Sequence, residues 1–150
     1  MEINIFDFIA RMEEDLARFY GFLKTVSRFR DSEELFNFMI RHSQGHAHEA
    51  ESLTTRYVRP EMNRDFFLKL NDQIKKSLLE EVRNATSLPE AIQKIARTEE
   101  QVGRMYEALA LHYKKLSEYY QAISEEMMAL SREEMTHRDM VLAELKKYHD

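Results

Sequence analysis

Apolar residues recur three or four positions apart, the spacing of a helix face, in four long stretches of this chain. The first stretch runs from about residue 4 to residue 28 and predicts a long amphipathic helix. The second opens at DSEE, where Asp31 or Ser32 can act as the N-cap and acidic residues follow in the first turn, and it runs to about Tyr57. These stretches predict two long helices joined by a short link.

Two further long helices are predicted in the second half of the chain. The third begins at SLPE, where Ser87 can cap the helix and Pro89 is tolerated in the opening turn. The fourth follows a break near KKLSEYY that neither Gly nor Pro marks. Its apolar positions are Leu116, Tyr120, Ile123, Met127, Leu130, Val141 and Leu145.

The connection between the second and third helices is long. It starts at Pro60 and spans about thirty residues, too many for a hairpin link. Within it, NRDFFLKLNDQIKKSLLEEV has its own helical spacing, from Phe66 or Phe67 to Val82, which predicts a shorter extra helix. The order of short link, long crossover and short link predicts an all-α four-helix bundle with a single long crossover. We expect one domain over residues 1–150.

The amino-acid composition favours a helical protein and argues against membrane and nucleic-acid-binding proteins. The chain holds only three Gly and two Pro, and 33% of its residues are charged, which is typical of long helices. No apolar run approaches the roughly 18 residues of a membrane span, and the N-terminus lacks the pattern of a signal peptide, so we expect a cytoplasmic protein without membrane contact. The net charge of −5 and the scattered Lys and Arg indicate that nucleic acid is not a partner. Cysteine is absent, so a metal would need oxygen and imidazole ligands.

A glutamate interrupts the apolar stripe of the first helix and another interrupts that of the third. These are Glu13 and Glu99, and each opens a related octet, 13-EEDLARFY-20 and 99-EEQVGRMY-106. The octets share two acids, an Arg and a terminal Tyr at the same places, which makes them a short internal repeat. For each glutamate alone, an exposed place on the helix flank is the alternative, and the adjacent Glu14 or Glu100 could be the inward member of the pair.

The second and fourth helices can also be aligned by their stripes. In this register His46 coincides with His137, and Ser43 stands where Glu134 stands in the stretch EEMTH. The match holds over about four turns of helix. The chain therefore resembles two copies of one helix pair. Stripes facing a common core would bring the two histidines and three glutamates to about the same level.

Buried carboxylates require a compensating positive charge. A carboxylate in a low-dielectric core without partners costs several kcal/mol, and neighbouring carboxylates also repel one another. Protonated histidines could supply the charge, but neutral imidazole and carboxylate together form a ligand set for a divalent first-row metal. One Glu from each of two helices plus Glu-x-x-His from the other two is the arrangement that holds two metals in bundle cores.

At this point the chain resembles the ferritin-like superfamily and, within it, the rubrerythrin-like di-iron carboxylate proteins. The resemblance covers nearly the whole chain in helix order and crossover. The residues that carry it are Glu13, Tyr20, His46, Glu99, Tyr106, Glu134 and His137. It implies that Tyr20 and Tyr106 hydrogen-bond the ligand carboxylates and fix their orientation. A tyrosine at helical spacing is also ordinary core filling.

The resemblance assigns a role to each candidate ligand. Glu13 and Glu99 would be the ligands from the first and third helices, Glu134 a bridging carboxylate, and His46 and His137 the terminal imidazoles. The implied cofactor is iron, with two ions bound, and manganese or zinc can occupy the same ligand set.

The second helix departs from the family pattern. The family has Glu-x-x-His there, whereas this chain has 43-SQGH-46 and so lacks the second bridging carboxylate. His42 and Glu49 flank His46 and could compensate, Gln44 could lean inward, or the site could hold one metal. Gly45 in mid-helix could mark a local distortion that changes which side chain points inward.

Two functions follow as expectations. By resemblance, the chain would be a non-haem di-iron oxidoreductase of rubrerythrin type, a peroxidase or oxidase acting on peroxide or oxygen. It lacks a rubredoxin-like segment with paired cysteines, so a separate partner would donate the electrons, and the resemblance implies a homodimer. Ser43 supports the alternative, a structural or binding bundle with a degraded or mononuclear metal site and no redox catalysis.

Overall fold

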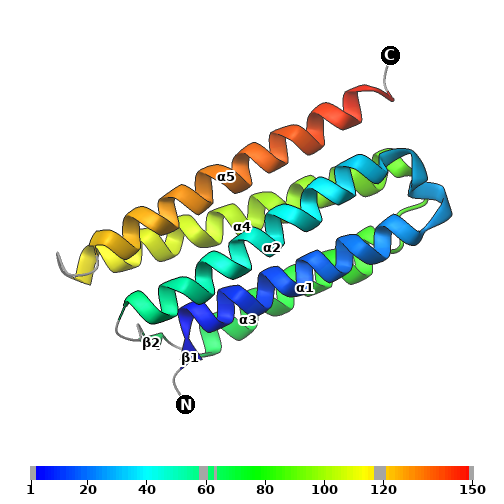
Figure 1. Ribbon diagram of the computed structural model, residues 1–150. Coiled ribbons are helices and arrows are strands. Elements are labelled where there is room, and N and C mark those ends of the chain that lie inside the picture. The colour runs from blue at the N-terminus through cyan, green and yellow to red at the C-terminus, as the bar shows by residue number, and fades with distance from the viewer. Residues whose placement is uncertain (1–2, 58–60, 63, 117–120, 149–150) are drawn as a thin grey trace. The chain divides into compact units, whose positions relative to one another are not determined.

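A computed structural model shows an all-helical protein with one pair of two-residue strands (Figure 1). It describes residues 3–57, 61–62, 64–116 and 121–148, and these contain five α-helices. The chain divides into two compact units, Met1–Lys76 and Ser77–Asp150. The predicted helical class is therefore confirmed. Among the described residues, none of the helices combines the length and the apolar character that crossing a membrane requires.

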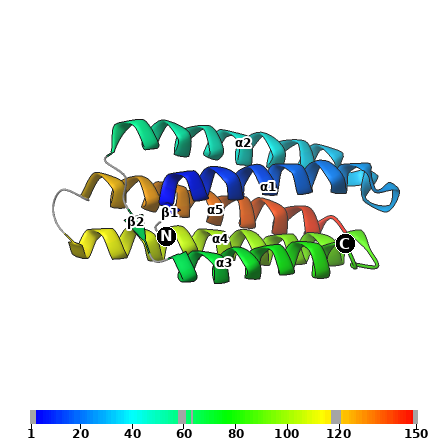
Figure 2. The ribbon, with the colours of Figure 1, turned by 90° about the horizontal axis from the view of Figure 1, so that it is seen from below.

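The first unit is built on an antiparallel helical hairpin. Helix α1 (Ile5–Thr25) is followed by the short 3-10 helix η1 (Ser27–Ser32) and by α2 (Glu33–Arg56), and the two long helices lie side by side in all views (Figures 1 and 2). The Asn4 side chain caps α1 by accepting a hydrogen bond from the backbone N–H of Phe6 at 2.9 Å. We call α1 and α2 the first hairpin.

The link between these helices differs in detail from the prediction. Helix α1 ends at Thr25, and η1 occupies the residues that were expected to finish the first helix. Ser32 is the N-cap residue of α2, as predicted, but its side chain makes no capping hydrogen bond. Helix η1 runs directly into α2, and the backbone N–H of Glu33 donates to the carbonyl of Arg30.

The extra helix of the crossover is confirmed. Helix α3 (Arg64–Lys76) follows strand β2 (Glu61–Met62), which pairs antiparallel with β1 (Ile3–Asn4). Phe67 is the inward member of the Phe66–Phe67 pair, and its ring lies 4.7 Å from that of Phe8 on α1. Phe66 is 46% exposed. Lys75 also reaches Asp15 of α1 at 3.3 Å, so α3 packs on the first hairpin.

The second unit begins with a π-helix. This segment, η2 (Ser77–Val82), continues directly from α3 and contacts α4 (Leu88–Leu116). The hydroxyls of Ser77 and Thr98 lie 3.1 Å apart in the buried contact. The π-helix is not foreseen by the sequence pattern, which reads as ordinary helix to Val82.

Helix α4 starts as predicted. The Ser87 hydroxyl accepts a hydrogen bond from the backbone N–H of Glu90 at 3.3 Å, and the Glu90 carboxylate accepts one from the backbone N–H of Thr86 at 2.8 Å. Together these bonds satisfy backbone donors at the helix start, in the manner of a capping box. Pro89 sits within the first turn.

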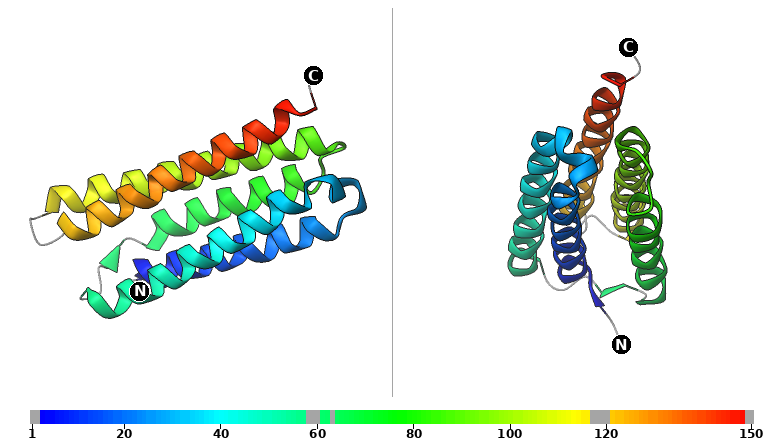
Figure 3. Two further views of the ribbon diagram at one scale, coloured as in Figure 1. Left: turned by 45° about the horizontal axis from the view of Figure 1, so that its top comes forward. Right: turned by 90° about the vertical axis from the view of Figure 1, so that its right-hand side faces the viewer.

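Helices α4 and α5 (Gln121–Lys146) form a second antiparallel hairpin (Figures 1 and 3). The weakly marked break is confirmed, because α4 ends at Leu116 and α5 begins at Gln121. Of the residues predicted in the stripe of the fourth helix, Leu116 is instead the last residue of α4, and Tyr120 lies outside the described residues. The apolar core of the second hairpin includes Ile92, Ile95, Val102, Leu109, Tyr113, Ile123, Met127, Leu130 and Val141.

Candidate metal centre

Three of the predicted ligands meet in the second hairpin. Glu99 comes from α4, and Glu134 and His137 come from α5. They are 2%, 2% and 4% exposed. The Nδ1 atom of His137 lies 3.5 Å from Oε2 of Glu134 and 3.9 Å from Oε2 of Glu99, and one ligand atom from each residue lies within 4.8 Å of the others.

Local sequence explains this convergence. Glu134 and His137 are three residues apart, so they occupy adjacent positions on one face of α5. That face continues the apolar stripe through Leu130 and Val141, both buried. Glu99 occupies the equivalent inward position on α4, and packing of the two stripes turns all three side chains into the hairpin.

Gly103, which carries no stripe signal in the sequence, lies where the two helices approach closely. A Cβ atom on Gly103 would lie 3.1 Å from Cβ of Glu134 and 3.4 Å from the carbonyl oxygen of Ser131. Gly103 is one turn beyond Glu99 on α4. Its signal in the sequence is a glycine in mid-helix, inside the repeated octet and one turn from a candidate ligand.

The charges of this cluster favour a cation. The two negative charges of Glu99 and Glu134 as carboxylates exceed the single positive charge that a protonated His137 could supply. Burial makes the remaining negative charge costly. Two ligand atoms bound at about 2.1 Å to one first-row ion are separated by about 3.0 to 3.4 Å. The observed separation of 3.5 Å between His137 and Glu134 is close to this range, and that of 3.9 Å between His137 and Glu99 is longer. The cluster is therefore one that could hold a metal.

The first hairpin carries a related but smaller cluster. Glu13 of α1 and His46 of α2 are 0% and 3% exposed, and Oε1 of Glu13 lies 3.5 Å from Nδ1 of His46. Ser43, aligned with Glu134, is buried as well. The predicted inward positions of both hairpins are thus confirmed. The prediction that all five ligands belong to one centre stays a prediction.

The residues that could replace the missing carboxylate, His42, Glu49 and Gln44, differ in how far they are buried. His42 is half-buried, with its ring centroid 4.1 Å from that of Phe38 and 6.5 Å from that of His46. Glu49 and Gln44 are exposed, so Gln44 does not lean inward. Helix α2 continues without a break through Gly45.

The choice within each glutamate pair is settled by burial. Glu14 is exposed and Glu100 is half-buried, and they form ion pairs one turn along the helix with Arg18 (3.6 Å) and Arg104 (2.6 Å). The tyrosines that end the two octets, Tyr20 and Tyr106, are fully buried. Their proposed contact with ligand carboxylates stays a prediction.

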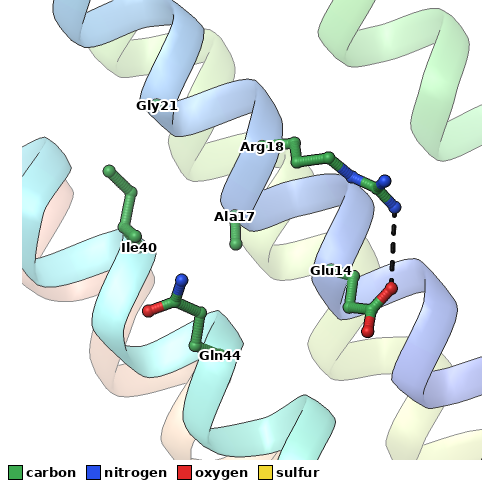
Figure 4. A pocket seen from close by; sticks show the side chains of 6 residues that line it. All are labelled: Glu14, Ala17, Arg18, Gly21, Ile40 and Gln44. Atoms are coloured by element: carbon green, nitrogen blue, oxygen red, sulfur yellow. Dashed lines mark ion pairs between the residues drawn. The ribbon is translucent and has the colours of Figure 1, made fainter.

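The first hairpin has a groove on its surface. An open groove of about 400 Å³ runs between α1 and α2 (Figure 4), where Ile40 and Gln44 face the small residues Ala17 and Gly21. Its lining residues are Glu14, Ala17, Arg18, Gly21, Ile40 and Gln44. In the repeat, Ala17 corresponds to Gly103 and Gln44 to Met135, so the groove occupies the place where the second hairpin is closely packed.

Comparisons of this chain with protein-family models, with curated proteins and with solved structures gave no match.

Proposed function

We propose that this chain binds a divalent first-row transition metal through Glu99, Glu134 and His137. The observation that supports the proposal is the convergence of two carboxylates and one imidazole, all almost fully buried, in one helical hairpin. Oxygen and imidazole ligands suit iron and manganese, and zinc competes for the same set.

The finer proposal is a ferritin-like, rubrerythrin-type protein with two iron ions. It is supported by the repeated octet and by the matching buried pair Glu13 and His46 in the first hairpin. When bound, iron would supply the electrons that convert hydrogen peroxide to water, and a separate protein would have to restore them. A homodimer belongs to the same proposal and rests on the resemblance alone.

The chain's own residues would then have distinct tasks. Glu99 and Glu134 would neutralise the cations, the two imidazoles would complete the ligand set, and Tyr20 and Tyr106 would orient the carboxylates. The apolar core residues around the clusters would limit the access of water.

Ser43 favours a second candidate function. It is buried at the position where a bridging carboxylate would complete a second metal site. A hydroxyl is a poor ligand for these metals, so the first hairpin would contribute less binding energy than the second. In this case the chain holds one structural metal and carries out no redox reaction.

Metal loading separates the two functions. The full chain is loaded anaerobically with ferrous iron, and bound iron per chain is measured together with the absorbance that develops on adding peroxide. Two irons and a ferric absorbance band support the oxidoreductase, and one iron that does not react with peroxide supports the structural site. A chain that binds no first-row metal would overturn both. Glu133→Gln, on the exposed side of α5, serves as the control for general effects of charge removal.

A further inference from the structure

The three glycines of the chain differ in what surrounds them. A Cβ atom on Gly21 or Gly45 would have nothing within 4 Å. A Cβ on Gly103 would instead lie 3.1 Å from both Cβ of Glu134 and Cε of Met135. Glycine in a helix interior is less favourable than alanine. At Gly103 this cost is accompanied by a close approach of α4 to α5.

The two contacts at Gly103 differ in how easily they can yield. The Met135 methyl group is the end of a flexible side chain and can move aside. Cβ of Glu134 is fixed to the backbone of α5, and so is the carbonyl of Ser131 at 3.4 Å. An added methyl group at residue 103 can be accommodated only if α5 shifts by a few tenths of an ångström, or if α4 does.

We infer that Gly103 is a positioning residue that sets the spacing of the metal ligands between α4 and α5. This inference rests on the proposed metal site. Glu99 lies one turn before Gly103 on α4, and Glu134 faces Gly103 directly. Any change in helix spacing here therefore changes the separation of the two carboxylates. Metal sites tolerate ligand distances within only about 0.2 Å of the preferred values.

Cobalt(II) is the probe for the test, because its visible spectrum reports coordination number and geometry. The full chain, Gly103→Ala and the control Gly21→Ala are titrated with cobalt, and zinc affinity is measured by competition with a chelator. We expect Gly103→Ala to change the cobalt spectrum and to weaken zinc binding by about tenfold or more. Gly21→Ala should leave both unchanged, because its new methyl group meets open space.

The variant Met135→Ala separates ligand positioning from general packing. It removes the flexible contact and keeps the contact with Cβ of Glu134, so the double variant Gly103→Ala/Met135→Ala should retain the altered spectrum. If Gly103→Ala does not fold, as judged by circular dichroism, the double variant is measured in its place. Met135→Ala alone should leave the spectrum of the wild-type chain unchanged, and a changed spectrum would overturn the inference.

The remaining outcomes distinguish the inference from the proposed function. A wild-type chain that takes up no cobalt would overturn the metal site and the role of Gly103 with it. Wild-type binding together with an unchanged spectrum and affinity in Gly103→Ala would overturn the role of Gly103 alone. Restoration of the wild-type spectrum in the double variant would assign the effect to Met135 packing and would also overturn the inference.

Discussion

The two helical hairpins of this chain carry related sequences and different centres. In the second hairpin, Glu99, Glu134 and His137 converge, and Gly103 allows the helices to approach closely. The first hairpin keeps an inward glutamate and an inward histidine but has Ser43 at the place of the second carboxylate. An open groove lies beside it between α1 and α2.

The features that the hairpins share are those of the helix surface and core. Both octets contain an ion pair between residues one helical turn apart, Glu14 with Arg18 and Glu100 with Arg104. The hairpins differ where their helices face each other, at the positions of Ser43 and Gly103. The comparison teaches that the buried cluster of Glu99, Glu134 and His137 and the close helix packing occur in the same hairpin, whereas periodicity alone would treat the two hairpins as equal.

Glu134→Ser gives the second hairpin the serine of the first at the matched position and should have the largest effect on metal affinity. The variant removes one of the three proposed ligands, so we expect metal affinity to fall at least a hundredfold, which is about 2.7 kcal/mol. Binding is measured by isothermal titration with zinc and manganese. Glu133→Ser is the matched control, because Glu133 is the exposed neighbour on the same helix. Equal affinities of the two variants would show that Glu134 is not a ligand.

Ser43→Glu makes the reverse change and gives the first hairpin the Glu-x-x-His of the second. Without metal, a carboxylate at this buried position should lower the free energy of unfolding by about 3 to 5 kcal/mol. With metal, bound ions per chain should rise, and part of the lost stability should return. Urea unfolding with and without manganese, together with elemental analysis, measures both effects.

The control for that variant is Gln44→Glu, which adds the same charge at the exposed neighbouring position. We expect it to change neither metal content nor stability by more than about 0.5 kcal/mol. Metal content that stays at the wild-type value in Ser43→Glu would contradict the proposed equivalence of Ser43 and Glu134.

Much of the fold could be predicted from periodicity. Helical spacing identified the long helices and the crossover helix, and it selected Glu13 over Glu14 and Glu99 over Glu100, because the inward stripe admits one member of each pair. The Ser87 cap could also be predicted, since a capping sequence acts within a single turn.

Other features depend on contacts that no local pattern records. Nothing in the sequence marks the change from α1 to η1, where Val26 leaves the helical conformation with φ −77° and ψ 118°. The role inferred for Gly103 depends on the spacing between two helices, and a glycine has no side chain to appear in a stripe. The sequence pattern indicates Gly45 instead, although a Cβ atom there would have nothing within 4 Å.

Gly45→Ala sharpens the contrast between the glycines of the two hairpins. Gly45 lies in mid-helix with room for a Cβ atom, so alanine should stabilise α2 by about 0.5 to 1 kcal/mol. Thermal and urea unfolding in the presence of a chelator measure the change without any contribution from metal. Destabilisation by this substitution would mean that α2 needs glycine at this position for a reason other than packing.

The N-termini of α2 and α4 differ in capping, and a substitution there should have the smallest effect on stability. Ser32 makes no capping hydrogen bond, whereas Glu90 is held by Lys94 at 2.7 Å and by the backbone N–H of Thr86. The hydrogen bond from Lys94 is the main cause that lowers the pKa of Glu90 from its ordinary value near 4.5 to about 2, and the bonds from Thr86 add to it.

Because this pKa is lower in the folded chain, ionised Glu90 stabilises the protein above its ordinary pKa, and the contribution is lost as pH falls from about 4.5 towards 2. Solvent exposure keeps the effect small. Glu90→Gln should therefore be less stable than wild type at pH 6, and the difference should shrink over this acidic range. Urea unfolding as a function of pH measures it. Lys94→Met removes the main cause of the lowered pKa and should weaken the pH dependence of stability. A stability difference between Glu90→Gln and wild type that does not vary with pH would contradict the assigned role of the Glu90 carboxylate.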